Sequence, residues 1–413
     1  MLTGILRGAF AAPYPLWMCA FRPFFLATVV AAPLFIGLWV AFLALDLPLP
    51  TVAGGPFVWH AHELILGFGL AVVAGFVLTV VPEFTASADF GRRAVRILAG
   101  LWLLGRFAFW CSGLFGVPAL ALAGLAHLAL LGGLAWLTAP RLWRDPERKH
   151  LAFLWALGAL AVCVAGFYFD ALRGEHPARW LNASLGVLMM LIVISMSRIS
   201  MRIVNDALDV AGADSTDGTD YRARPPRRNL ATFCIGLYTA AEFFVPDTRL
   251  SGWLALAAAA ALFNLMSDWH IGRILFRRWV LMLYGVYVLM AAGYAVMGLA
   301  LVLDGSGFSA GRHILAVGAL GLAIYAVMCI AGRIHCGQQL DEHPWVPLGA
   351  ALIAIAALLR AGVAWPGADG SLLLAVSGLL WGAAFALCAW HMVPLWLAPR
   401  QDGGSGCEGL LAP

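Results

Sequence analysis

Long apolar runs, separated by charged residues, proline or glycine, follow one another along the whole chain. In lipid every backbone amide must find its hydrogen-bond partner within the protein, so runs of about 20 apolar residues predict membrane-spanning helices. Only 12% of the residues are charged, whereas a soluble domain typically carries about 25%. The sequence therefore predicts an all-α integral membrane protein with a bundle of about twelve transmembrane helices. The runs lie at about 21–45, 58–82, 93–114, 117–139, 149–171, 179–204, 228–246, 249–269, 278–303, 311–332, 344–365 and 371–398.

The spans form two blocks within a single polytopic membrane domain covering 1–413. They occupy about 21–205 and 228–398, and the connection at 206–227 is rich in Asp, Gly, Thr and Pro, which is typical of a surface loop. We expect the glycine-rich tail at 400–413 to be disordered.

Positive charges are distributed unevenly between the loops. Seventeen arginines and lysines fall in the even-numbered loops and four in the odd-numbered ones. Because positively charged loops stay on the cytoplasmic side, we expect both termini to be cytoplasmic. No block of basic residues resembles a nucleic-acid-binding arm, so lipid is the expected partner.

Several ionisable residues are predicted at the outer ends of their spans. His60, His62 and Glu63, in the run WHAHE, open the second span. With the topology above, the other residues predicted at this level are Arg106, His313 and Arg360. Charged groups at membrane depth are costly and usually have a function or a partner. On an α-helix His60 and Glu63 would share one face and His62 would point away.

Two interpretations of these residues remain open. In the first, the histidines are anchors in the headgroup zone beside Trp59. In the second, they bind a metal or haem, with Arg106 and Arg360 pairing with the propionates. His335, after the tenth span, is a further candidate metal ligand. For His127, inside the fourth span, we expect a hydrogen bond to a backbone carbonyl.

The eight cysteines are scattered and form no CxxC pair. Since most lie inside apolar runs, we expect them to pack as small hydrophobic residues, without disulfides. The absence of CxxCH means that any haem would be a non-covalent haem b.

Five sequence blocks resemble the NnrS family of bacterial membrane proteins. They are FRPFFL at 21–26, WHAHELILGF with VVAGFVLTVVPEFT at 59–85, LWLLGR at 101–106, HILAVGALGLAIYAVM at 313–328 and PRQDG at 399–403.

The resemblance implies haem b and copper as cofactors and nitric oxide as a small-molecule ligand, in the response to nitrosative stress or in denitrification. It also implies the bacterial inner membrane as the location. It does not identify an electron donor, nor does it separate an enzyme from a sensor. His60, His62, Glu63, Arg106 and His313 fall on family positions. The resemblance places a histidine of the family at Tyr284, so we expect haem without stoichiometric copper in this chain.

A secondary transporter of the major facilitator type is the alternative. Twelve spans with a polar central loop suit that fold, and SADFGRRAVR at 87–96 resembles its DRxGRR loop. A transporter, however, places its charged residues near mid-membrane, whereas here they are predicted at one face.

Overall fold

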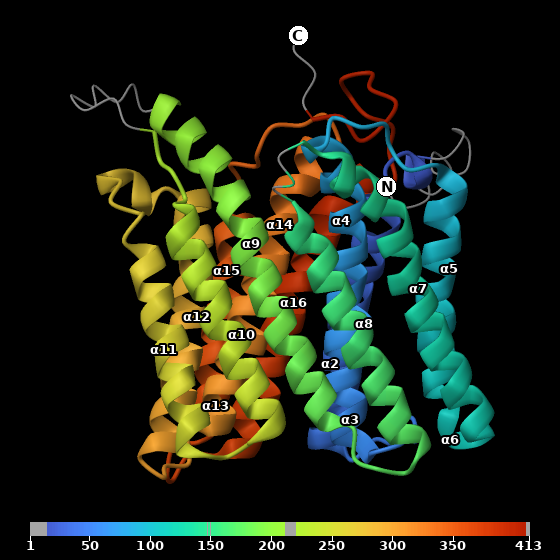
Figure 1. Cartoon of the computed structure of the whole chain (residues 1–413), viewed down its shortest axis with the longest axis vertical. Coiled ribbons are helices and arrows are strands. Elements are labelled where there is room, and N and C mark those ends of the chain that lie inside the picture. Colours follow the sequence, from blue (N-terminus) through green and yellow to red (C-terminus); the bar gives the residue numbers. More distant parts are fainter. Residues whose placement is uncertain (1–14, 147, 149, 211–219, 410–413) are drawn as a thin grey trace. The chain divides into compact units, whose positions relative to one another are not determined.

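The computed structural model describes residues 15–146, 148, 150–210 and 220–409, and within these ranges the chain is helical, with no strand. Ten helices or helix series are long and apolar enough to cross a membrane. The predicted all-α membrane fold is confirmed (Figure 1). The ten are α2 (Phe21–Leu45), α3–η2–α4 (Gly55–Phe84), α7 (Val117–Arg144), α8 (Leu151–Leu172), α9 (Ala178–Val210), α11 (Arg249–Met266), α12 (Arg278–Val302), α13–η4–α14 (Phe308–Ile334), α15 (Trp345–Gly362) and α16 (Gly370–Trp396).

The two remaining predicted spans, 93–114 and 228–246, also correspond to helices. They are α5 (Arg92–Trp110) and α10 (Pro225–Phe244), which are more polar because each has arginines in its first turn. The shorter helices are η1 (Pro15–Trp17), α6 (Ser112–Phe115) and η3 (Gly272–Phe276).

The contacts between residues divide the chain into two compact units. The first contains the described residues within Met1–Ser184, Val327–Val346 and Gly382–Pro413, and the second those within Leu185–Ala326 and Pro347–Trp381. In the first unit, α2 packs on α4, α5 on α7, and α7 on α8 (Figure 1). In the most apolar 18-residue stretch of the span Gly55–Phe84, 94% of the residues are buried, so the helix that follows the WHAHE run lies in a packed core.

The connection predicted at 206–227 is shorter than expected. Helix α9 continues to Val210, and α10 begins at Pro225; residues 211–219 lie outside the described part. Asn205 bonds both the amide and the carbonyl of Tyr221, at 2.8 and 3.3 Å, and these bonds hold the two ends of the connection together.

The segment after α16 packs against the first unit over residues 400–409, which differs from the predicted disorder of 400–413. Arg400 is 5% exposed and donates to the carbonyls of His335, Gly406 and Gly409. Buried charged donors of this kind must be paired, and pairing orders the segment. Residues 410–413 lie outside the described part.

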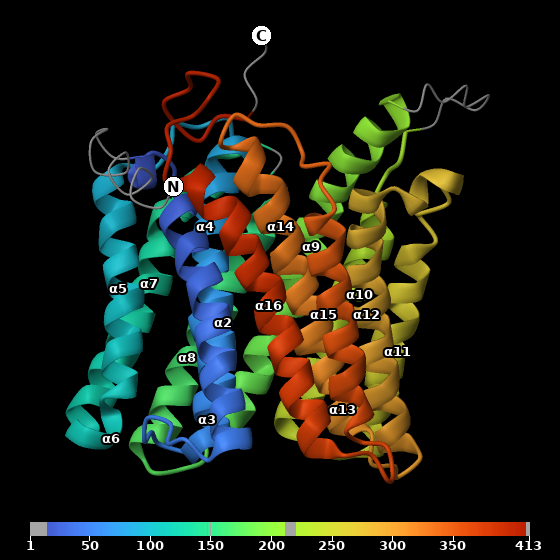
Figure 2. The ribbon, with the colours of Figure 1, turned by 180° about the vertical axis from the view of Figure 1, so that it is seen from behind.

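Arg22, in the FRPFFL block, ties the start of α2 to the end of α16. Its side chain is fully buried and donates to the carbonyls of Pro15, Trp396 and Ala398 at 2.9, 3.1 and 2.7 Å. Figure 2 shows α2 beside the C-terminal part of α16, where Phe25 packs edge-on against Trp396. The FRPFFL block therefore has a structural role.

Cys19 and Cys407 form a disulfide across 388 positions of sequence, so the expectation of cysteines without disulfides is wrong for this pair. Their spacing carries no signal, because the two cysteines meet only once the C-terminal segment has folded back. The other six cysteines are free thiols.

Candidate functional site

The second predicted span changes its helix type directly after His62. Helix α3 (Gly55–His62) continues into η2 (Glu63–Gly69), which is a π-helix. Each residue of a π-helix turns the chain through a smaller angle than in an α-helix, and such segments are frequent at functional sites. The Glu63 carboxylate lies 2.9 Å from Nδ1 of His62, its neighbour in the chain. The expectation that Glu63 shares a face with His60 is wrong.

Five side chains from four helices form a closed hydrogen-bonded ring in the first unit. Arg106 donates from Nη1 to Glu63 Oε1 at 3.0 Å, and from Nη2 to His127 Nε2. The Tyr168 hydroxyl lies 3.0 Å from His127 Nδ1 and 3.0 Å from His62 Nε2. The contact between His62 and Glu63 closes the ring, which we call the His62 ring.

The partners within the His62 ring determine which nitrogens carry protons. His127 Nδ1 donates to the Ala123 carbonyl at 2.7 Å, so its Nε2 is free to accept from Arg106. His62 donates from Nδ1 to the Glu63 carboxylate, and its Nε2 accepts the Tyr168 hydroxyl. Every ring nitrogen of the two imidazoles is thereby used. The prediction of a carbonyl bond for His127 is confirmed.

The His62 ring is buried. His62, Glu63 and His127 are fully buried, and Arg106 is 6% exposed. His62 also stacks on Phe109, with ring centroids 3.6 Å apart. In a site this dry, the pair of Glu63 and Arg106 neutralises two charges that neither residue could carry alone.

His127 and Tyr168 are the members of the His62 ring that sequence reasoning missed. His127 was assigned to its own backbone, and Tyr168 was not singled out. A signal existed, since each is a polar residue inside an apolar span. What the sequence does not show is that α7 and α8 turn these residues toward Arg106.

His60 lies apart from the ring. Its imidazole stacks on Trp39 of α2, with centroids 4.3 Å apart and planes 20° from parallel. His60 and His62 therefore contact different partners, as expected for residues two positions apart on a helix.

A second histidine–arginine pair, in the second unit, joins His313 and Arg360. His313 ends α13 (Phe308–His313), and its Nδ1 donates to the Ser309 carbonyl at 2.7 Å. Arg360, on α15, places Nη2 3.1 Å from His313 Nε2. The neighbouring Arg312 pairs with Glu242 of α10. The unprotonated Nε2 of His313 therefore accepts a hydrogen bond from Arg360.

The two histidine segments share one local construction. The π-helix η4 (Ile314–Leu320) follows His313 as η2 follows His62, and each histidine stands five positions before a glycine, Gly67 or Gly318. Each π-helix also has a carbonyl that accepts an indole N–H: Gly67 from Trp102 at 2.9 Å, and Val317 from Trp381 at 3.1 Å.

His335 lies elsewhere in the first unit. Its Nδ1 is 2.6 Å from the carbonyl of Cys407, and its Nε2 is 3.7 Å from Glu83. Among the described residues, no group of three or more His, Cys, Asp or Glu side chains is arranged to hold a metal ion. Tyr284 packs edge-on against Trp269, with centroids 5.6 Å apart.

Within the first unit, the geometry brings together two of the blocks that carried the family resemblance, WHAHE and LWLLGR. A family model described as NnrS protein matches residues 15–400. The chain belongs to the NnrS family. The comparison with curated proteins gives no match. In this NnrS-family protein, WHAHE and the arginine of LWLLGR build the His62 ring, and HILAVGAL supplies the second pair. The family match lends no support to the alternative of a major-facilitator transporter.

Proposed function

We propose that this NnrS-family protein is a haem b protein of the bacterial inner membrane that binds nitric oxide and acts in the nitrosative stress response or in denitrification. The family supplies this context. The observation that carries the haem assignment is the tautomer of His313, whose Nδ1–H donates to the Ser309 carbonyl at 2.7 Å and whose unprotonated Nε2 accepts from Arg360 at 3.1 Å.

His313 would suit a ligand of haem iron, because metal-bound histidines generally donate their second ring N–H to a carbonyl or carboxylate. Arg360, beside Nε2, fits a partner for a propionate, since guanidinium groups bind carboxylates in a bidentate fork. Both histidines have two bonded ring nitrogens, but His62 fits less well as a ligand because it is fully buried between Glu63 and Tyr168 in the His62 ring, whereas His313 is only half-buried. The predicted role of His62 as a ligand therefore requires the ring to open.

Haem iron would supply the centre at which nitric oxide binds. The chain's own contribution would be to hold the His313 tautomer through Ser309 and to offer the Arg360 guanidinium. The remaining predicted residues, His60, Glu63, Arg106 and His335, stay proposals as cofactor or metal partners. Copper, which the family resemblance also implies, would meet Tyr284 where the family has a histidine, and phenol is a poorer copper ligand than imidazole.

The cytoplasmic location of both termini belongs to the same proposal. It rests on the excess of arginine and lysine in the even-numbered loops. Cysteine introduced at Asp220, in the central connection, should react with a membrane-impermeant maleimide only after the cells are opened. Cysteine at Gly54 should react in intact cells once the outer membrane is permeabilised. The reverse pattern would contradict the topology.

The haem proposal is tested by an absorption spectrum of the full chain purified from cells supplied with a haem precursor. We expect a Soret band with b-type bands on reduction, and a shift of the Soret band when nitric oxide is added to the reduced protein. Metal analysis of the same sample gives the copper content. A folded but colourless protein would contradict the proposal.

A further inference from the structure

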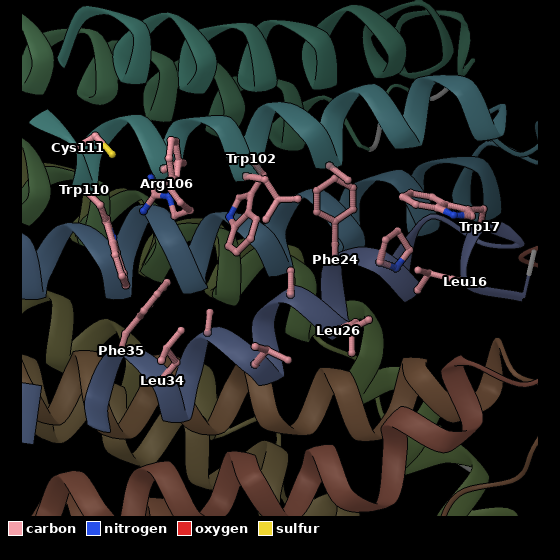
Figure 3. A pocket seen from close by; sticks show the side chains of 17 residues that line it. Leu16, Trp17, Phe24, Leu26, Leu34, Phe35, Trp102, Arg106, Trp110 and Cys111 are labelled. Carbon is pink, nitrogen blue, oxygen red and sulfur yellow. The ribbon is translucent and has the colours of Figure 1, made fainter. Parts of the chain in front are cut away.

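A groove of about 670 Å³ lies between α2 and α5, within the first unit. Volumes of this size are typical of sites for small molecules and cofactors. Figure 3 shows Trp102, Arg106 and Trp110 of α5, and Cys111 directly after it, along one wall, and Phe35 along the wall formed by α2. The His62 ring does not use this groove, although Arg106 belongs to both.

The groove opens toward lipid. Val30 and Leu34 of α2, and Leu103 and Phe107 of α5, line it and are 53%, 47%, 60% and 71% exposed. On spanning helices such exposed apolar side chains face acyl chains, so a molecule dissolved in the bilayer reaches the groove sideways. The groove is apolar and aromatic over most of its length.

One charged side chain lines the groove, at the level of the His62 ring. Arg106 is 6% exposed, and both of its terminal nitrogens bond within the ring. Its Nε is buried and, among the described residues, has no hydrogen-bond partner. An orphaned buried donor is costly, and a carbonyl acceptor placed in the groove would satisfy it.

The charge at this point decides what kind of acceptor fits. Arg106 and Glu63 form a buried ion pair at 3.0 Å, so the donor carries no net uncompensated charge. A neutral carbonyl therefore suits it better than a carboxylate or phosphate, which would bring a second anion close to Glu63. The aromatic rings of Phe35, Trp102 and Trp110 favour a planar ring, because such rings stack edge-on or offset.

We propose that the groove between α2 and α5 binds a lipophilic quinone, with its ring among the aromatic side chains and a carbonyl oxygen accepting a hydrogen bond from Arg106. The tail of the quinone would lie along the apolar part of the groove. This proposal does not depend on haem.

The rate at which the Cys111 thiol is modified reports directly whether the groove is occupied. This thiol is half-buried and lines the groove, whereas Cys234, also half-buried, lies on α10 in the other unit. The full chain in nanodiscs is treated with a lipid-soluble maleimide, with or without a short-tailed benzoquinone whose ring is fully substituted and cannot add thiols. Mass spectrometry then follows the modification of each cysteine. We expect saturating quinone to slow the modification of Cys111 about tenfold, as for a well-occupied site, and to leave Cys234 unchanged.

Two comparisons make the result specific. An alkylbenzene with the same tail lacks the carbonyls and should protect Cys111 poorly. Val30→Trp should close the groove and remove the protection, whereas Leu125→Trp, at a 67% exposed position of α7, should retain it.

Equal protection by the alkylbenzene or by oleate would identify a general lipid groove and overturn the proposal. So would unchanged modification of Cys111, or protection that survives Val30→Trp. The haem content of the same samples shows separately whether the haem proposal holds.

Discussion

The single carboxylate of the His62 ring determines the charge state of its surroundings. Glu63 Oε1 receives both Arg106 and His62, at 3.0 and 2.9 Å, in a site with no exposed surface on Glu63. A buried guanidinium cannot stay charged at low cost without this partner. Loss of the Glu63 carboxylate would therefore leave the positive charge of Arg106 without its counter-ion.

Glu63→Gln should lower the free energy of unfolding by about 3–5 kcal/mol, because the change leaves a buried cation without its counter-ion. The measurement is thermal unfolding in detergent. The matched control is Asp304→Asn, which removes the exposed partner of Arg249 and should cost less than about 1 kcal/mol. Equal effects of the two changes would show that Glu63 is solvated and not part of a buried ring.

The sequence alone identifies those residues of the His62 ring that lie in polar motifs. Glu63 and Arg106 were singled out from their cost at membrane depth, and they meet in the structure. His127 and Tyr168 complete the ring, but their orientation depends on how α7 and α8 rotate about their axes. Helices α7 and α8 are apolar nearly all round, so their sequences give little indication of that rotation.

Among the helices, close approach of α5 to α7 positions the ring. Gly105 stands one residue before Arg106, and a Cβ atom there would lie 2.7 Å from Cε1 of His127. Small residues at such points let membrane helices approach each other closely. The glycine of LWLLGR is therefore part of the construction of the site.

Gly105→Ala should push His127 away from Arg106 and destabilise the protein by about 1–3 kcal/mol, as overpacking typically does. Gly100→Ala on the same helix is the control, because a Cβ there would meet no atom within 4 Å. That change should be neutral or stabilising by up to about 1 kcal/mol, through helix propensity. Thermal unfolding of both variants checks the pair, and a harmless Gly105→Ala would contradict the packing.

The helices themselves were largely predictable, because a spanning helix needs only a long apolar run. All twelve predicted runs coincide with helices. The π-helices after His62 and His313 were not predictable, since an i→i+5 pattern differs from the α-helix by one residue over a few turns. The repeated spacing from histidine to glycine is visible in the sequence, but five positions alone carry little information.

For the whole molecule, the disulfide between Cys19 and Cys407 links the first helices to the C-terminal segment. Denatured, unreduced protein should therefore expose six reactive thiols, and eight after reduction. Thiol titration under both conditions is the measurement. Both cysteines are buried, at 2% and 7% exposure, which should limit access of reductants to the folded protein. Eight thiols before reduction would show that the bond does not form in cells.

The most direct test of the account compares haem per polypeptide in two histidine variants. We propose that His313 binds the iron and that His62 has a structural role within the His62 ring. His313→Ala, purified beside the parent protein, should lose most of its haem while keeping its thermal stability. His62→Gln should keep haem near the parent level and unfold at a lower temperature. Full haem in His313→Ala, together with a haem-free but stably folded His62→Gln, would contradict the account.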